Sequence, residues 1–203
     1  MISNILSIIA NTKAVKELKN ETAKYFVTDD VIGTALLACS YYKESKNNLT
    51  VITSNLYNAQ RVYDIISSII GENECFLFPV DELLRSDSIA ASKEMIVQRL
   101  YVLNELQTKE RYILVTHSLA VMSYLPDPKL FKETCLNISV GDKIDLQSIK
   151  EKLITMGYSH VHKLDHSLQF ANRGDILDVY SVNNEQPIRI ELFDDVVESI
   201  RIF

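Results

Sequence analysis

The sequence predicts an α/β fold, in which a parallel-sheet domain is followed by a smaller α+β domain with an antiparallel sheet. Through the first half of the chain, apolar runs of strand length alternate with amphipathic helical patterns, which is typical of a buried parallel sheet. Leu125-Pro126-Asp127-Pro128 then interrupts this pattern. After it, short strand patterns are separated by polar turn pairs, which favours antiparallel pairing.

Four strands and three helices are expected in the first half. Asn55 begins a helix whose apolar residues recur every three or four positions, and Gly71 ends it. Pro79 stops the third strand, and Ser92 begins the last helix. The predicted strands cover residues 24–27, 49–53, 75–78 and 112–116, and the predicted helices cover residues 33–43, 55–70 and 92–106.

The second half is expected to contain one clear helix and four short strands. Asp145 caps the helix, which runs to Met156 and is closed by Gly157. We therefore divide the chain into domains of residues 1–124 and 125–203. Because the sequence stops at Phe203 inside a strand pattern, we also expect the chain to be a piece of a longer protein. The four strands are predicted over residues 159–164, 176–182, 188–193 and 196–203.

Charge and composition argue against several classes of function. The 203 residues carry a formal net charge of −6, so a generic phosphate-binding surface is not expected. No apolar run approaches the roughly 20 residues that span a bilayer, so no membrane partner is predicted. The three widely spaced cysteines form neither a disulfide framework nor a zinc pattern, and they indicate a cytoplasmic protein with reduced thiols.

Residues 27–35 connect the first predicted strand to the first helix, where a phosphate-binding loop would lie in a nucleotide-binding fold. Such a loop needs glycines for close backbone approach and a lysine for the terminal phosphates. This segment has a single glycine and no lysine, and Asp29 and Asp30 would repel a phosphate. We therefore predict neither nucleotide binding nor catalysis here. A nucleotide hydrolase that uses this loop is the alternative.

Other polar motifs have simpler interpretations. His160 and His162 would point the same way from a strand, but no neighbouring cysteine or carboxylate completes a metal site. His117-Ser118 lacks the Gly-x-Ser-x-Gly context of a nucleophile elbow, so it is interpreted as a helix start. Asp81-Glu82 are likewise interpreted as charges at a helix start. No catalytic residue and no metal ligand is predicted.

The strand at residues 188–193 places an aromatic residue on its polar face. Successive strand residues point to opposite sides, so the even-numbered, apolar residues form one face. Arg189, Glu191 and Phe193 form the other. Phe193 is then either a single exposed or loop-covered hydrophobe, or an anchor for a partner, because arginine and aromatic residues are enriched at interface hot spots.

Arg173 adds a second guanidinium group to this half of the chain. It precedes Gly174, which is expected to form a turn or a bulge in front of the next strand. Each of the two arginines could instead pair with a nearby acid such as Asp175 or Glu191. A DNA-binding module that uses the arginines is a further alternative.

Five segments together carry a resemblance to a known family. The chain is similar, over nearly its whole length, to the amino-terminal region of the bacterial transcription-repair coupling factor family, Mfd. The matching segments are residues 78–84 (FPVDELL), 140–146 (VGDKIDL), 170–180 (FANRGDILDVY), 187–194 (PIRIELFD) and 199–201 (SIR).

The resemblance implies a function. Mfd proteins displace stalled RNA polymerase from damaged DNA and recruit the excision-repair proteins. The chain is therefore expected to be an adaptor that recruits UvrA in transcription-coupled nucleotide excision repair. Its first domain would be a degenerate, RecA/helicase-like nucleotide fold similar to that of UvrB, and its second domain would bind UvrA. The two arginines and one phenylalanine with which the family contacts UvrA fall on Arg173, Arg189 and Phe193.

The resemblance also places other activities outside this chain. ATP and Mg²⁺ belong to the motor domain of an ATP-dependent DNA translocase, and RNA polymerase and DNA bind domains that would follow Phe203. No cofactor is therefore expected here. UvrB has a working phosphate loop and a long aromatic hairpin that grips DNA. In this chain the loop at residues 27–35 is degenerate, and residues 79–92 are too few for the hairpin. A nucleotide-dependent or DNA-binding UvrB-like helicase module is the alternative function.

Overall fold

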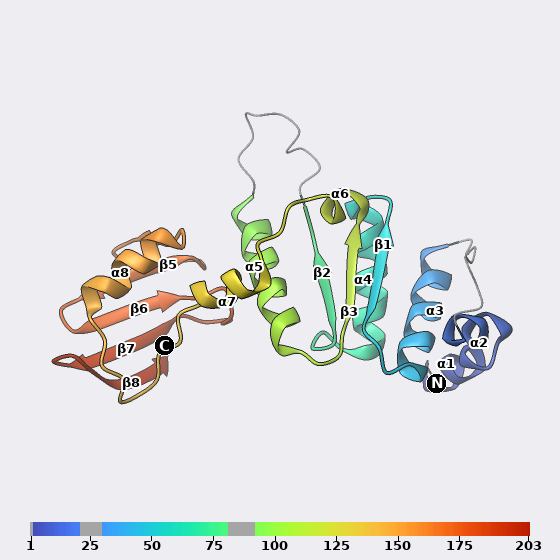
Figure 1. The fold of residues 1–203 in the computed structure, drawn as a ribbon, viewed down its shortest axis with the longest axis horizontal. Helices are drawn as coiled ribbons and strands as arrows, with labels where there is room; N and C mark the ends of the chain where they lie inside the picture. The colour runs from blue at the N-terminus through green and yellow to red at the C-terminus, as the bar shows by residue number, and fades with distance from the viewer. Residues whose placement is uncertain (1, 21–29, 81–91) are drawn as a thin grey trace. The chain divides into compact units, whose positions relative to one another are not determined.

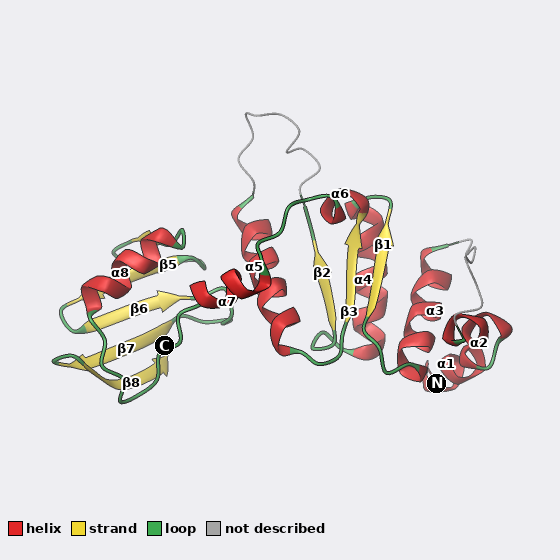
Figure 2. Ribbon diagram, in the orientation of Figure 1, coloured by secondary structure: helices red, strands yellow, loops and turns green. Residues whose placement is uncertain are grey.

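The computed structural model describes residues 2–20, 30–80 and 92–203 of the chain (Figure 1). The chain divides between Tyr124 and Leu125 into two compact units, called unit 1 and unit 2 in chain order. Each unit has its own sheet and its own hydrophobic core (Figure 2). The strand predicted at residues 24–27 and the acidic pair at residues 81–82 lie outside the described residues.

Within the described residues, unit 1 contains a three-stranded parallel sheet in the order β1-β3-β2. The central strand β3 pairs with both neighbours, so that Leu49 and Cys75 both lie opposite Ile113. The buried parallel sheet that the sequence predicts is therefore confirmed for these strands, which are β1 (Leu49–Thr53), β2 (Cys75–Phe78) and β3 (Ile113–His117).

The longer helices of unit 1 begin and end near the residues that the sequence marks. The side chains of Asp30, Asn55 and Ser92 each accept a hydrogen bond from the backbone N–H three residues further on. Gly71 ends α4 with a φ of 100°, a conformation that residues with a Cβ rarely adopt. The helices are α1 (Ile2–Ala10), α2 (Lys13–Lys19), α3 (Val31–Glu44), α4 (Leu56–Ile70), α5 (Lys93–Thr108) and α6 (Ser118–Val121).

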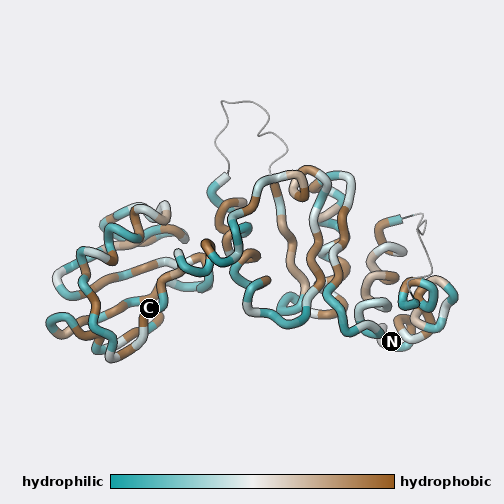
Figure 3. Tube along the Cα trace, in the orientation of Figure 1, coloured by the Kyte–Doolittle hydropathy of each residue, from teal (hydrophilic) through white to brown (hydrophobic). Residues whose placement is uncertain are grey.

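Helices cover both faces of the unit 1 sheet. Alternate residues of β2 enter different cores, with Cys75 and Leu77 on one side and Phe76 and Phe78 on the other. Residues of α1, α3 and α4 complete the first core, and residues of α5 and α6 complete the second. The hydropathy colouring shows apolar residues along these central strands (Figure 3). Coverage of both faces is what a parallel sheet requires.

Unit 2 contains a five-stranded sheet in the order β4-β5-β6-β7-β8. Neighbouring strands are antiparallel except β4 and β5, which are parallel, so the predicted antiparallel sheet is mixed at one edge. The strands are β4 (Ser159–His160), β5 (Gln169–Arg173), β6 (Ile176–Tyr180), β7 (Ile188–Phe193) and β8 (Val196–Ile202), and the helices are α7 (Pro128–Thr134) and α8 (Leu146–Thr155).

The prediction was wrong about the first strands of unit 2. A strand was expected at residues 159–164 and none at residues 169–173, whereas β4 has two residues and β5 has five. The central residues of β5, Ala171 and Asn172, have low intrinsic strand propensity. Pairing decides the outcome, because all five residues of β5 lie opposite residues of β6 across a tight turn at Gly174.

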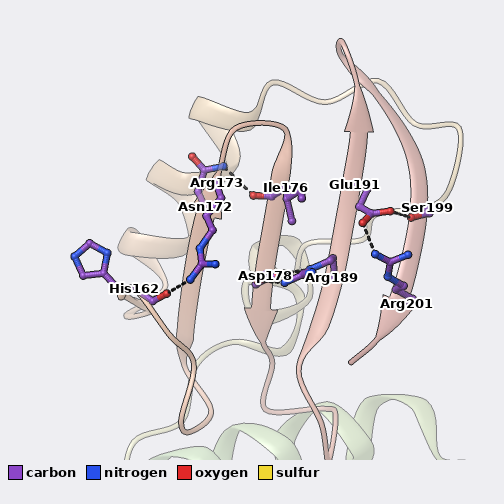
Figure 4. Close-up of polar contacts among 9 residues, drawn as sticks. All are labelled: His162, Asn172, Arg173, Ile176, Asp178, Arg189, Glu191, Ser199 and Arg201. Atoms are coloured by element: carbon purple, nitrogen blue, oxygen red, sulfur yellow. Dashed lines mark hydrogen bonds and ion pairs between the residues drawn. The ribbon is translucent and has the colours of Figure 1, made fainter.

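One face of the unit 2 sheet is covered by α8. The core on this side contains Ile149 and Leu153 of the helix, and its other fully buried members come from β5 to β8. The opposite face carries polar and charged side chains, among them Asp178, Arg189, Glu191 and Arg201 (Figure 4). The buried strand residues are Phe170, Leu177, Val179, Ile190, Leu192 and Val197.

Candidate partner-binding face of unit 2

The two faces of β7 differ as the sequence predicts. On the helix side, Ile190 and Leu192 are 2% and 8% exposed. Phe193 is the last residue of the same strand and points to the other side, where it is 71% exposed. The interpretation of Phe193 as a residue of the solvent face is therefore confirmed. Burying a phenylalanine of this exposure against a partner would remove a large apolar area from water.

Arg189 is held by a neighbouring strand. Its Nε and one Nη donate to the two carboxylate oxygens of Asp178 at 2.7 and 2.8 Å, and Asp178 lies directly opposite it on β6 (Figure 4). These hydrogen bonds raise the pKa of Arg189, which keeps it a cation at all ordinary pH values. The guanidinium carbon also lies 4.5 Å from the centre of the Phe203 ring. The arginine does pair with an acid, but the acid is Asp178 rather than Asp175 or Glu191.

Glu191 has different partners on the same face. Its carboxylate accepts hydrogen bonds from Arg201, and from Ser199 at 2.8 Å (Figure 4). Both partners lie on β8, and Arg201 lies directly opposite Arg189. Like charges in directly opposed positions repel, so each arginine is stabilised by a carboxylate of its own.

Arg173 has no carboxylate partner within ion-pair distance among the described residues. Its side chain donates to the backbone carbonyl of His162 at 2.9 Å. The tight turn that follows is fixed by Asn172, whose side-chain amide donates to the carbonyls of Gly174 and Ile176. Gly174 has a φ of 59°, which confirms the predicted turn. Arg173 is therefore an exposed cation at a rigid corner of the sheet.

The strand register places all three predicted residues on one face. Arg173 pairs with Ile176, and Ile176 pairs with Glu191, so Arg173 lies on the same side as Arg189 and Phe193. We call the side chains of these three residues, with Asp178, Glu191, Ser199 and Arg201, the open face. Sequence reasoning missed Asp178, although its charge interrupts the apolar strand Ile176–Tyr180 and alternates with the buried Leu177 and Val179.

The remaining sequence motifs have structural roles. His117 is buried, and its Nε2 accepts a hydrogen bond from the Val80 N–H at 3.1 Å. Ser118 donates to the carbonyl of Ser54. The imidazole of His160 stacks on the Phe170 ring at 4.9 Å between centroids. No group of three or more histidine, cysteine or acidic residues that could hold a metal ion occurs within the described ranges.

The amino end of α3 is the described part of the candidate phosphate loop. Asp30 Oδ1 accepts a hydrogen bond from the Gly33 N–H at 2.5 Å, so a carboxylate already occupies the position where a phosphate oxygen would bind. The preceding residues 27–29 lie outside the described residues. Elsewhere in the described chain, no helix is long and apolar enough to cross a membrane.

Comparison with known proteins adds an independent result. Residues 136–203, which contain the whole open face, match the family described as the UvrB interaction domain. A transcription-repair-coupling factor from Bacillus subtilis is 37% identical over 160 residues, which is 79% of this chain. The chain is similar to one region of the transcription-repair-coupling factors. The resemblance drawn from the sequence motifs is therefore confirmed.

Two further transcription-repair-coupling factors define how much of these proteins the chain represents. The protein from Staphylococcus haemolyticus is 31% identical over 168 residues, and one from Staphylococcus epidermidis is 28% identical over 205 residues, which is 97% of this chain. The chain spans 14% of the B. subtilis protein and 17% of the S. epidermidis protein. These relatives are thus several times longer than the chain described here.

Proposed function

We propose that this chain is the UvrA-recruiting adaptor region of a transcription-repair-coupling factor, acting in transcription-coupled nucleotide excision repair. One observation supports the proposal above the others. The segment similar to the UvrB interaction domain has a sheet face on which Arg173, Arg189 and Phe193 lie together, with Phe193 71% exposed. UvrA is the partner that the family resemblance implies for these positions.

The chemistry of the open face suits protein docking. Phe193 supplies an apolar anchor that would fill a pocket on UvrA, and a guanidinium group can recognise a carboxylate or a backbone carbonyl with directed hydrogen bonds. Two of the three arginines, Arg189 and Arg201, are already paired with acids, so the face as a whole is weakly charged. That balance favours a protein partner over the phosphate backbone of DNA.

Unit 1 is proposed to be a scaffold without enzymatic activity. The Asp30 carboxylate at the start of α3 would have to move away before a phosphate could bind there. The segment also has no lysine that could bind the phosphate. ATP hydrolysis, DNA translocation and contact with RNA polymerase are then tasks of other parts of the parent protein. Such a protein acts in the cytoplasm, where stalled polymerases are found.

The test is a binding titration of purified UvrA with the chain of 203 residues. We expect saturable binding by the wild type and none detectable for a variant that combines Arg173→Ala, Arg189→Ala and Phe193→Ala. The control combines Tyr57→Ala and Arg61→Ala on α4, which removes a similarly exposed aromatic residue and its neighbouring cation from unit 1. A wild-type chain that fails to bind UvrA, or a triple variant that binds equally well, contradicts the proposal.

A further inference from the structure

The guanidinium group of Arg189 is fixed on two sides. One edge is taken by Asp178, which receives hydrogen bonds from Nε and Nη2. One planar side faces the ring of Phe203, with the guanidinium carbon 4.5 Å from the ring centre. Such a bidentate contact together with a stacked ring leaves a guanidinium little freedom to rotate.

The other two arginines of the open face are held less firmly. Arg201 pairs with Glu191, and its side chain is 56% exposed, compared with 27% for Arg189. Arg173 makes a single hydrogen bond to a carbonyl oxygen. The Asp178 side chain is only 9% exposed, so its pair with Arg189 is the least solvated ion pair of this face. Arg189 is therefore the most rigid cation of the open face.

The geometry also determines which donors of Arg189 are free. A guanidinium group has five N–H donors, and the contact with Asp178 uses Nε–H and one N–H of Nη2. The second N–H of Nη2 and both of Nη1 make no hydrogen bond to the described residues. One free N–H of Nη2 and one of Nη1 point in parallel along the second edge of the group, where they match one carboxylate or two carbonyl oxygens.

We propose that Asp178 and Phe203 are positioning residues for partner docking, which hold Arg189 so that its free edge receives a carboxylate or carbonyl group of UvrA. This inference rests on the proposed function. The charge of Arg189 is largely balanced by Asp178, so UvrA recognises the shape of the free edge more than the positive charge. A lysine side chain carries the same charge, but its ammonium group has no planar arrangement of donors on two edges. It therefore cannot hydrogen-bond to Asp178 and to the partner in this geometry.

The test measures UvrA affinity for Asp178→Asn, for Phe203→Leu and for Arg189→Lys in the chain of 203 residues. We expect each to weaken binding, Asp178→Asn by about tenfold, and we expect Asp178→Asn to have no further effect when Arg189 is already alanine. Glu151→Gln is the matched control, because it also removes one carboxylate charge but lies on α8, on the covered side of the sheet. Phe203 is 50% exposed, so its variant tests the proposal even if Asp178→Asn unfolds.

A second measurement does not depend on UvrA. In nitrogen-15 NMR spectra, the Nε–H of Arg189 should give a sharp, slowly exchanging signal in the wild type that is lost in Asp178→Asn and kept in Glu151→Gln. Wild-type affinity in folded Asp178→Asn and Phe203→Leu variants overturns the inference, and if Arg189→Ala still weakens binding, the proposed function stands. A wild-type chain that does not bind UvrA at all contradicts the proposed function itself.

Discussion

The two sheets of this chain differ in how many of their faces are covered. In unit 1, helices pack on both sides of a parallel sheet, and every residue of β2 is buried. In unit 2, α8 packs on one side only of a mostly antiparallel sheet, and the other side carries Phe193 and three arginines. A fully covered sheet can act as a scaffold, whereas an antiparallel sheet can keep one face free for a partner.

The difference also shows where each unit tolerates polar groups. Unit 1 admits few buried polar side chains, and His117 and Thr116 among them hydrogen-bond to the backbone of β2 or the residues just after it. Unit 2 places an ion pair, Arg189 with Asp178, in the middle of its sheet without disturbing the core on the other side. Because successive residues of a strand point to opposite faces, the same strands can supply an apolar core on one side and charged groups on the other.

The largest effect is expected from the covered face. Ile190→Ala should lower the free energy of unfolding of unit 2 by about 2–5 kcal/mol, because it leaves a cavity beneath α8. The measurement is chemical denaturation of the chain. Ile202→Ala on β8 is the matched control, since Ile202 is 65% exposed and the same atoms are removed. Equal losses for both variants would mean that burial beneath α8 does not decide the contribution of Ile190.

The next largest effect is expected on the open face, and it concerns binding. Phe193→Ala should weaken UvrA binding by about 2 kcal/mol or more, as truncation of a hot-spot aromatic residue does, with little change in melting temperature. Calorimetric titration and thermal unfolding measure the two quantities. Tyr57→Ala is the control, because Tyr57 is 70% exposed on unit 1. If Phe193→Ala unfolds unit 2 at unchanged affinity, the two faces of β7 have been assigned the wrong way round.

Arg173 should contribute less, and its contribution should depend on salt. It is the cation of the open face without a carboxylate partner among the described residues, so Arg173→Ala should slow association with UvrA and cost about 1 kcal/mol or less at physiological ionic strength. Association rates measured over a range of salt concentrations test this. Arg201→Ala, whose charge is balanced by Glu191, should change the salt dependence less.

Unit 1, whose sheet is covered on both faces, should also lose stability at alkaline pH. Burial raises the pKa of Cys39 to about 11 and that of Cys75 to about 12, from an ordinary value of 9.0. In the unfolded chain these thiols ionise first, so their contribution to stability is complete below about pH 9 and declines as the pH rises towards 11–12.

Cysteine variants separate this effect from general alkaline denaturation. Cys39→Ala and Cys75→Ala should each flatten the pH dependence of the unfolding free energy of unit 1 above pH 9, which denaturation at a series of pH values measures. Cys135→Ala should leave the slope unchanged, because Cys135 is exposed in unit 2. The same slope in all three variants would show that burial of the thiols is not the cause.

ATP should have the smallest effect, with no shift in the melting temperature of the chain. A ligand that binds only the folded state stabilises it by RT ln(1 + [L]/Kd), so millimolar ATP with Mg²⁺ would reveal even weak binding. The expectation follows from the Asp30 cap of α3 and the missing lysine. Saturable calorimetric binding at sub-millimolar ATP contradicts it and revives the nucleotide-dependent alternative.

Local sequence determined much of this protein. The helix caps at Asn55 and Asp145 and the turn at Gly174 follow from residue chemistry that acts within a few positions of the chain. The alternation in β7 likewise determined that Phe193 lies on the solvent face of the sheet, because a one-residue shift in register would have buried Arg189. These features are decided by residues that lie close together in the chain, so the sequence alone predicts them.

Tertiary structure alone decided the rest. β5 exists because it pairs with β6, although Ala171 and Asn172 disfavour a strand, and the acid that holds Arg189 is Asp178, eleven residues away, instead of the nearer Glu191. Both outcomes depend on strand register, which brings together residues distant in the sequence. The register follows from hydrophobic burial summed over the whole sheet, and no local pattern contains that sum.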